Sequence, residues 1–102
     1  MKSTIRHNRE KQRYELWIDG ELVGFAAYQP FETGRAFTHT EIAEGLRGGG
    51  FAAELVTAVL DDARSSGTKI WPFCSYVVSF IARHPQYIDL VPQESRSRFN
   101  LQ

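Results

Sequence analysis

The sequence lacks the residues that a cross-linked, metal-bound or membrane-spanning protein needs. It has one cysteine, Cys74, so no internal disulfide is available. Its three histidines are scattered without metal-ligand spacing. No apolar run approaches the ~20 residues of a membrane helix, and the N-terminus has no apolar stretch typical of a signal peptide. We therefore expect a cytoplasmic protein with no metal and no membrane partner.

An excess of charge of one sign is also lacking. Twelve Lys and Arg residues balance twelve Asp and Glu residues, so the chain offers no broad basic field for nucleic acid. What it has is a globular composition, with 42% hydrophobic and 13% aromatic residues in a chain of 102. We expect a single domain, 1–102, because this length suits one hydrophobic core. The folded part of this domain should cover about residues 5–91, followed by a polar, frayed tail over 92–102.

Alternating apolar and polar residues predict an antiparallel meander in the first half. The expected strands are 5–8, 14–18, 22–28 and 35–42, the last of them after a turn at 29–34. Asp19-Gly20 is a hairpin signal because both residues tolerate positive φ. In the strand at 35–42, strict alternation places Thr38, Thr40 and Ile42 on one face and Phe37, His39 and Glu41 on the other.

The hydrophobic period changes in the second half. From Phe51 to Ala63, apolar residues recur at helical intervals, and Gly67 is placed to end this helix. The pattern then predicts a strand at 68–73, a second short helix at 76–84 and a last strand at 87–91. The expected fold class is α+β, with an antiparallel meander followed by a long helix, a strand and a short helix packed on a mixed sheet.

The most informative segment is a glycine-rich turn, Arg47-Gly48-Gly49-Gly50, between a predicted strand and the long helix. Three glycines cost backbone entropy, but they let a ligand approach main-chain N–H groups at a helix end that favours negative charge. Arg47 adds a forked donor for phosphate oxygens. The turn therefore predicts a phosphate or pyrophosphate site. The alternative is a flexible connection that binds nothing.

Two common phosphate motifs do not match this turn. A P-loop requires Lys and Ser or Thr after its last glycine, where Phe51 and Ala52 stand. A dinucleotide fingerprint belongs in a βαβ unit, whereas this turn follows a meander. The segment from Arg47 to Ala52 does resemble the pyrophosphate-binding motif of the Gcn5-related N-acetyltransferase superfamily, which binds acetyl-coenzyme A.

Further motifs extend the resemblance to the small YjdJ-like branch of that superfamily, over about residues 5–91. They are the segments 24–28, 37–42, 46–52, 72–77 and 81–87. The resemblance implies the fold of these acetyltransferases with an open acetyl-coenzyme A cleft. Gly49 and Ser75 depart from it, since many relatives have a basic residue and a proline there. The chain is also too short for the helical insertion that shapes the acceptor site in larger members.

The resemblance also implies which residues hold the cofactor. The pantetheine arm would pair like an extra strand with the end of the fourth strand, and the pyrophosphate would lie on the glycine turn. Arg83 and His84 would reach the adenosine phosphates, or else merely complement a helix C-terminus. The implied cofactor-binding residues are Ile42, Ala43, Arg47, Gly48, Gly49, Gly50, Phe51, Ala52, Ser75, Tyr76, Arg83 and His84.

Two side chains are candidates for the chemistry. Glu41 would act as a general base on the acceptor ammonium, whose free pKa is about 10.4, or else is an ordinary strand carboxylate paired with His39. Cys74 lies before a predicted helix N-terminus, which favours a thiolate. It would form a transient acetyl-cysteine or protonate the leaving coenzyme A, or else it merely packs.

The expected function is that of an acetyl-coenzyme A-binding N-acetyltransferase that transfers acetyl to a primary amine of a small molecule or protein. The alternative is a coenzyme A sensor or adaptor without turnover. We expect a monomer or weak homodimer and no nucleic-acid partner.

Overall fold

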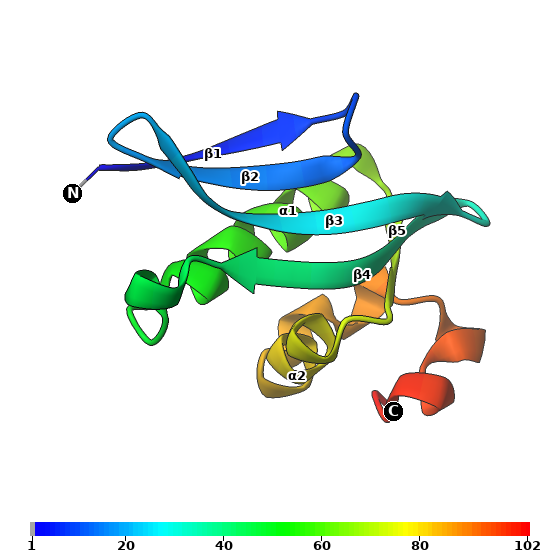
Figure 1. Ribbon diagram of the computed structural model, residues 1–102. Helices are drawn as coiled ribbons and strands as arrows, with labels where there is room; N and C mark the ends of the chain where they lie inside the picture. Colours follow the sequence, from blue (N-terminus) through cyan, green and yellow to red (C-terminus); the bar gives the residue numbers. More distant parts are fainter. Residues whose placement is uncertain (1) are drawn as a thin grey trace.

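The computed structural model describes residues 2–102, in which one five-stranded sheet has the order β1-β2-β3-β4-β5. Its first four strands pair antiparallel, and β5 joins the edge of β4 in parallel (Figure 1). The strands are β1 (Ser3–Asn8), β2 (Arg13–Ile18), β3 (Glu21–Phe31), β4 (Gly34–Ile42) and β5 (Lys69–Pro72).

Two α-helices and four short 3-10 helices complete the described chain. The α-helices are α1 (Phe51–Ser66) and α2 (Ser75–Arg83). The 3-10 helices are η1 (Glu44–Leu46), η2 (Pro85–Leu90), η3 (Gln93–Ser95) and η4 (Ser97–Phe99). The predicted α+β class, with a meander, a long helix, a strand and a short helix, is confirmed.

Local sequence signals explain the two best-defined connections. Asp19 and Gly20 have φ of 50° and 83°, the positive values that a tight hairpin turn between β2 and β3 requires. Helix α1 ends at Gly67, whose φ of 70° lets its N–H bond back to the last turn. Both predicted boundaries are therefore confirmed.

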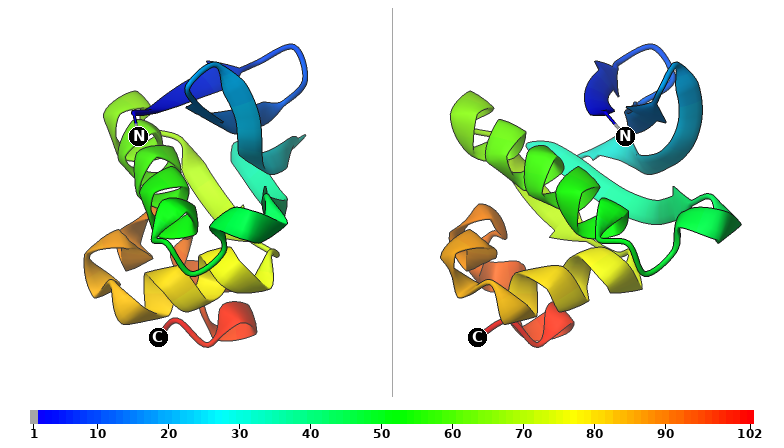
Figure 2. Two further views of the ribbon diagram at one scale, coloured as in Figure 1. Left: turned by 60° about the vertical axis from the view of Figure 1, so that its left-hand side comes forward. Right: turned by 90° about the vertical axis from the view of Figure 1, so that its left-hand side faces the viewer.

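Helix α1 covers one face of the sheet and leaves the other face of β1, β2 and β3 without a helix in the described part of the chain (Figures 1 and 2). On the covered face, Tyr14 and Leu16 of β2 pack with Leu55 and Val59 of α1. We call the uncovered side the open face.

Strand β4 contains a bulge that corrects one expectation from the sequence. Tyr28 pairs with Phe37, but Ala27 pairs with His39, so Thr38 is an extra residue in β4. The expected faces are wrong for Phe37 and Thr38, because the bulge shifts the period by one residue there. Thr40 still shares a face with Ile42, and His39 with Glu41, as expected. Phe37 and Ile42 are consequently both buried.

Strands β4 and β5 separate shortly after they pair. Their register runs from Gly34 opposite Lys69 to Phe37 opposite Pro72. The Cys74 N–H then donates to the Phe37 carbonyl at 2.8 Å. From His39 onward, β4 has no strand partner on its β5 side within residues 2–102. This free edge of β4 is where the candidate site lies.

Three expectations are wrong, for the turn at 29–34, for the last strand and for the C-terminal tail. The turn at 29–34 is shorter, because β3 continues to Phe31. The last strand at 87–91 is replaced by η2, in which Tyr87 and Leu90, three residues apart, are both buried. The tail packs instead of fraying, since Leu101 is 2% exposed and Ser95 accepts a hydrogen bond from the Trp71 indole.

Candidate functional site

The glycine turn presents free backbone N–H groups at the start of α1. Gly48 and Gly50 have φ of 83° and 85°, and Gly50 caps the helix without any side-chain hydrogen bond. The first intrahelical bond runs from Glu54 to Gly50. The three N–H groups before Glu54 therefore lack intrahelical partners and carry the positive end of the helix dipole.

The two left-handed glycines are needed for backbone conformation. A Cβ at Gly48 or Gly50 would meet no atom within 4 Å, so only the positive φ opposes a side chain there. Gly49 differs, because its φ is unexceptional but a Cβ would lie 3.3 Å from the Phe51 ring. The close Phe51 ring gives a local reason for glycine at this position.

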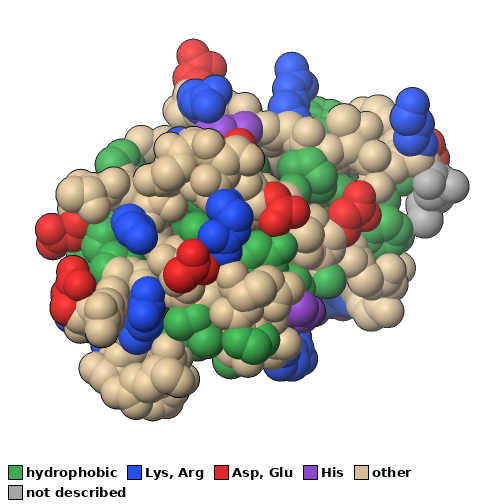
Figure 3. Space-filling view, turned by 180° about the vertical axis from the view of Figure 1, so that it is seen from behind, with side chains coloured by type: hydrophobic (Ala, Val, Ile, Leu, Met, Phe, Trp, Pro, Cys, Tyr) green, Lys and Arg blue, Asp and Glu red, His purple; other side chains and the backbone are tan. Residues whose placement is uncertain are grey.

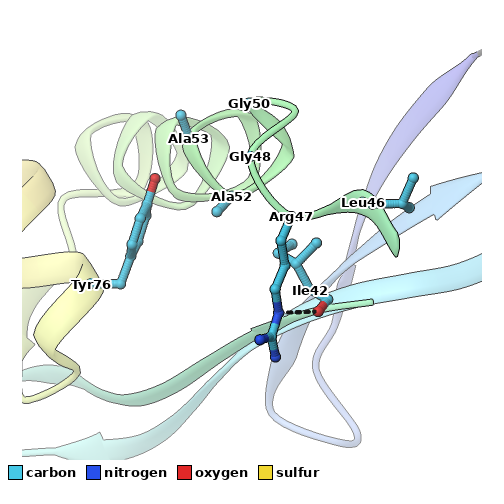
Figure 4. Close-up of a pocket in the computed structure, with 8 residues that line it drawn as sticks. All are labelled: Ile42, Leu46, Arg47, Gly48, Gly50, Ala52, Ala53 and Tyr76. Atoms are coloured by element: carbon cyan, nitrogen blue, oxygen red, sulfur yellow. Dashed lines mark hydrogen bonds between the residues drawn. The ribbon is translucent and has the colours of Figure 1, made fainter. Parts of the chain in front are cut away.

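Two adjoining cavities form a groove that starts at this turn. The first holds about 330 Å³ and is lined by Ile42, Leu46, Arg47, Gly48, Gly50, Ala52, Ala53 and Tyr76 (Figure 4). The second holds about 270 Å³ and shares four of these residues, Ile42, Arg47, Ala52 and Tyr76. It adds His39, Thr40 and Glu41. We call the combined cavity the β4 groove, since it follows the free edge of β4.

Arg47 and Tyr76 form opposite sides of this groove. Figure 4 shows the Tyr76 side chain reaching from α2 toward the first turn of α1, where Ala52 and Ala53 lie. Arg47 lies alongside Ile42, with its Nε 3.5 Å from the Ile42 carbonyl oxygen. The small alanine side chains leave space between the two, and the exposed Arg47 adds a cation beside the turn.

Glu41 lines the end of the groove farthest from the glycine turn, which we call the groove mouth. It lies on the opposite side of β4 from Thr40. Its carboxylate is 3.0 Å from Nε2 of His39, and both side chains are 57% exposed. The pairing with His39 that the sequence suggested is therefore present. Both groups remain accessible to a ligand from solvent.

Cys74 lies behind the groove, at the point where β4 and β5 separate. It is 8% exposed, and its thiol donates to Thr40 Oγ1 at 3.4 Å. It is also the N-cap residue of α2, with its carbonyl accepting from the Val78 N–H. Its sulfur is thus hydrogen-bonded to the hydroxyl of Thr40, which lines the groove.

The remaining candidate residues are divided between the groove and other places. Ala43 follows β4 and donates to the Val23 carbonyl, and Ser75 is exposed in the first turn of α2. Arg83 and His84 lie at the other end of α2 and line neither cavity of the groove. The His84 ring stacks on Phe80 at 4.1 Å and bonds its carbonyl.

Sequence reasoning did not assign four groove-lining residues to the site, His39, Thr40, Leu46 and Ala53. The alternation of residues already placed Thr40 on the same face as Ile42, but it could not show that this part of β4 has no strand partner on its β5 side and borders a groove. Ala53 belongs to a run of small residues at the start of α1, a signal of space that the helical pattern alone did not reveal.

Within residues 2–102, no group of three or more His, Cys, Asp or Glu side chains could hold a metal ion. Over the same described range, no helix has the length and apolar character to cross a membrane.

Comparison with known proteins gives one family match. A family model described as GCN5-related N-acetyl-transferase matches residues 13–90. No curated protein matches the chain. The solution structure of a GCN5-like protein from Staphylococcus aureus is similar, with a TM-score of 0.67, 20% identity and coverage of 86% of each chain.

Two larger proteins share the fold over part of their length. One is a GNAT family acetyltransferase from Elizabethkingia anophelis with acetyl-CoA bound, with TM-score 0.52, 18% identity and coverage of 57% of this chain and 39% of that one. The other is N-acetylglutamate synthase from Neisseria gonorrhoeae, complexed with coenzyme A and N-acetyl-glutamate. Its TM-score is 0.58 at 18% identity, over 96% of this chain and 26% of that one.

Proposed function

This chain belongs to the GCN5-related N-acetyltransferase family, and from that premise we propose that it binds acetyl-coenzyme A in the β4 groove and transfers the acetyl group to a primary amine. The observation that carries the proposal is the groove itself, which joins the glycine turn to the free edge of β4. The YjdJ-like branch stays a prediction.

The glycine turn is the proposed pyrophosphate site. Three N–H groups without intrahelical partners, the positive end of α1 and the Arg47 guanidinium all favour an anion there. Two structural neighbours are described with acetyl-CoA or coenzyme A bound, which supports the same cofactor class for this chain.

The free edge of β4 is the proposed site of the pantetheine arm. Backbone groups after Phe37 have no partner from β5 in the described chain. An extended arm with its own amide groups can bond to such an edge in the manner of an added strand. This placement would bring the thioester close to Thr40 and Glu41, which line the groove mouth.

Glu41 and Cys74 are the proposed catalytic groups. Glu41, with His39 beside it, would accept the proton that the acceptor ammonium must lose before it attacks the thioester carbonyl. The nitrogen–carbon bond then forms as the sulfur–carbon bond breaks. The nitrogen would lose its second proton to solvent, and the departing coenzyme A thiolate would take a proton from the Thr40 hydroxyl. Thr40 recovers a proton from the Cys74 thiol, and Cys74 recovers one from solvent before the next turnover.

The position of the Cys74 sulfur supports this proton role over an acetyl-cysteine intermediate. The thiol is buried and directed at Thr40, so a thioester in the groove would meet the threonine hydroxyl first.

The alternative is a coenzyme A sensor or adaptor without turnover. It is favoured by Glu41, which is exposed and already paired with His39. Mass spectrometry of candidate amines separates the two, since an acetyl mass shift lost in Cys74→Ala or Glu41→Gln supports the enzyme. Cofactor binding without transfer to any amine supports the sensor.

Calorimetric titration with acetyl-coenzyme A tests the cofactor site. Gly50→Glu places a side chain at a φ of 85° and a negative charge beside the pyrophosphate, so binding should be abolished. Gly45→Glu is the matched control, because a Cβ there meets no atom within 4 Å and its φ is not positive. Equal affinity in both variants would contradict the proposed site.

A further inference from the structure

One charged side chain on the open face, that of Glu15, is buried, and the proposed acetyl transfer does not use it. Glu15 is the one charged residue in the described chain classed as buried, with 2% exposure. It lies in β2 between Tyr14 and Leu16, which face the core, so its side chain lies on the open face. A carboxylate taken out of water is costly unless its partners compensate.

Three hydrogen bonds compensate the Glu15 carboxylate. They come from Arg13 Nε at 2.8 Å, Asn8 Nδ2 at 3.0 Å and Trp17 Nε1 at 3.1 Å. Burial alone would raise the pKa of the Glu15 carboxyl, but these three donors hold it below its usual value. The ionised carboxylate therefore fixes a guanidinium and an indole ring on a face that no helix covers.

The strand register connects this cluster to the groove mouth. Across the sheet, Asn8 pairs with Arg13, Arg13 with Ala27, and Ala27 with His39. The neighbouring row runs from Arg6 through Glu15 and Phe25 to Glu41. Neighbouring strands are about 4.8 Å apart, so each row spans roughly 14 Å from β1 to β4.

Aromatic and cationic side chains continue along these rows. The Arg13 guanidinium lies 5.1 Å from the centre of the Phe25 ring, and Phe25 lies 5.7 Å from the His39 ring. At the other end, Arg6 lies 5.9 Å from the centre of the Trp17 ring.

A cavity of about 610 Å³ at the β1–β2 end of the open face has a positive rim. Arg6, Arg9, Lys11 and Arg13 all line it, against the carboxylates of Glu10 and Glu15. Among the described residues, no carboxylate oxygen lies within 4.0 Å of Arg6, Arg9 or Lys11. The opposite side of the molecule differs, since Figure 3 shows positive and negative side chains interspersed there.

We propose that the open face docks the acceptor, and that the acceptor is an amine carried on an acidic peptide segment, with its carboxylates on the cationic rim and its amine at His39 and Glu41. This inference rests on the proposed acetyl transfer. A span of roughly 14 Å exceeds a single amino acid and suits a short peptide crossing the strands. The donor in the groove and the acceptor on the open face would then meet at the free edge of β4.

Binding of two matched peptides in the absence of acetyl-coenzyme A tests the docking surface. One peptide combines a lysine with several aspartates, and the other has asparagine at each aspartate position. At low salt the acidic peptide should bind at least about tenfold more tightly and lose this advantage as salt rises. Amide NMR shifts should then concentrate on β1, β2 and the end of β4. Equal binding of the two peptides, or binding of neither, would overturn the proposal.

Charge reversal provides the matched variants. The double variant Arg6→Glu with Arg9→Glu removes two exposed cations without a carboxylate partner, and it should weaken binding of the acidic peptide about tenfold or more. Arg98→Glu, on the distant C-terminal tail, reverses one charge, so it is the control for Arg6→Glu alone and should leave binding unaltered. An oligonucleotide that binds the open face more tightly than the acidic peptide would overturn the choice of a peptide partner.

Steady-state kinetics separates this inference from the proposed function. The double variant should raise KM for the acidic peptide while kcat and the affinity for acetyl-coenzyme A stay unchanged. If neither peptide is acetylated but the acidic one binds, the proposed transfer fails and with it the acceptor role. If both peptides are acetylated with equal KM, the transfer stands and the docking inference fails.

Discussion

His7 is the residue whose surroundings carry the clearest consequence for stability. Its ring stacks on Tyr14 at 4.0 Å and its Nε2 is 2.7 Å from the Tyr28 hydroxyl. Nδ1 is buried and has no hydrogen-bond partner within the described chain. Burial, followed by the charges of Arg35 and Arg9, lowers the pKa of His7 in the folded protein, although Asp62 opposes this.

The lowered pKa of His7 predicts acid sensitivity. Below the ordinary value of about 6.5, the unfolded chain takes up the proton more readily, so stability falls as the pH drops toward the folded-state pKa. Urea unfolding at about pH 7 and about pH 5.5 should show a larger loss in the natural protein than in His7→Phe, which retains the aromatic stack. Equal losses would assign the sensitivity to other groups.

Thr40 is the residue that tests the proton role of Cys74. Thr40→Val keeps the side-chain shape but removes the hydroxyl that accepts from the thiol, so kcat should fall about tenfold or more. Affinity for acetyl-coenzyme A should change little. Thr38→Val, at the exposed bulge position, is the control. An unchanged kcat in Thr40→Val would exclude a proton path through this hydroxyl.

At the scale of elements, the connection before α1 should depend on glycine at particular positions. Gly48→Ala places a Cβ at a φ of 83° and should destabilise the fold by about 1 kcal/mol. Gly45→Ala should not destabilise it, because its φ is not positive. Thermal unfolding of the two variants checks this difference, and a loss of the same size in both would argue against conformational strain.

Elements defined by local patterns could be predicted from the sequence. The hairpin at Asp19-Gly20, helix α1 and its end at Gly67 each depend on residues close together in the chain. The η2 segment could not, because Tyr87 is held by Asp61 of α1 and by the core, which override its β propensity.

The candidate site was only partly predictable for a related reason. The glycine turn and Arg47 are contiguous in sequence, so their motif could be recognised directly. The groove, by contrast, depends on where β4 and β5 separate and on a bulge in β4, which are properties of the assembled sheet. The place of Thr40 in the groove and the burial of Glu15 therefore had to come from the structure.

At the scale of the whole molecule, one core connects the first strands to the C-terminal tail. Leu101 belongs to the same cluster of buried residues as Leu16 of β2 and Leu55 of α1. Packing of the tail therefore contributes to the stability of the whole sheet and its helices.

Truncation of Leu101 tests this contribution. Leu101→Ala should destabilise the protein by about 2–5 kcal/mol, since it opens a cavity in a closely packed core. Leu22→Ala, at a position 39% exposed, should change stability by no more than about 0.5 kcal/mol. Denaturant unfolding followed by fluorescence and circular dichroism should give one coincident transition in both. A negligible effect of Leu101→Ala would show that the tail is dispensable.

The bulge at Thr38 also decides which side chains of β4 face the helices. Phe37 and Ile42 are both buried although they are five residues apart, an odd spacing that an unbroken strand cannot place on one side. If the same residues ran as a regular strand, with Thr38 paired instead of bulged, His39 and Glu41 would turn toward the helices and Ile42 would turn toward solvent. The bulge thus places Phe37 and Ile42 together on the apolar side of β4 and leaves His39 and Glu41 together on its polar side. A two-substrate reaction across its edge would then need no further layer of protein.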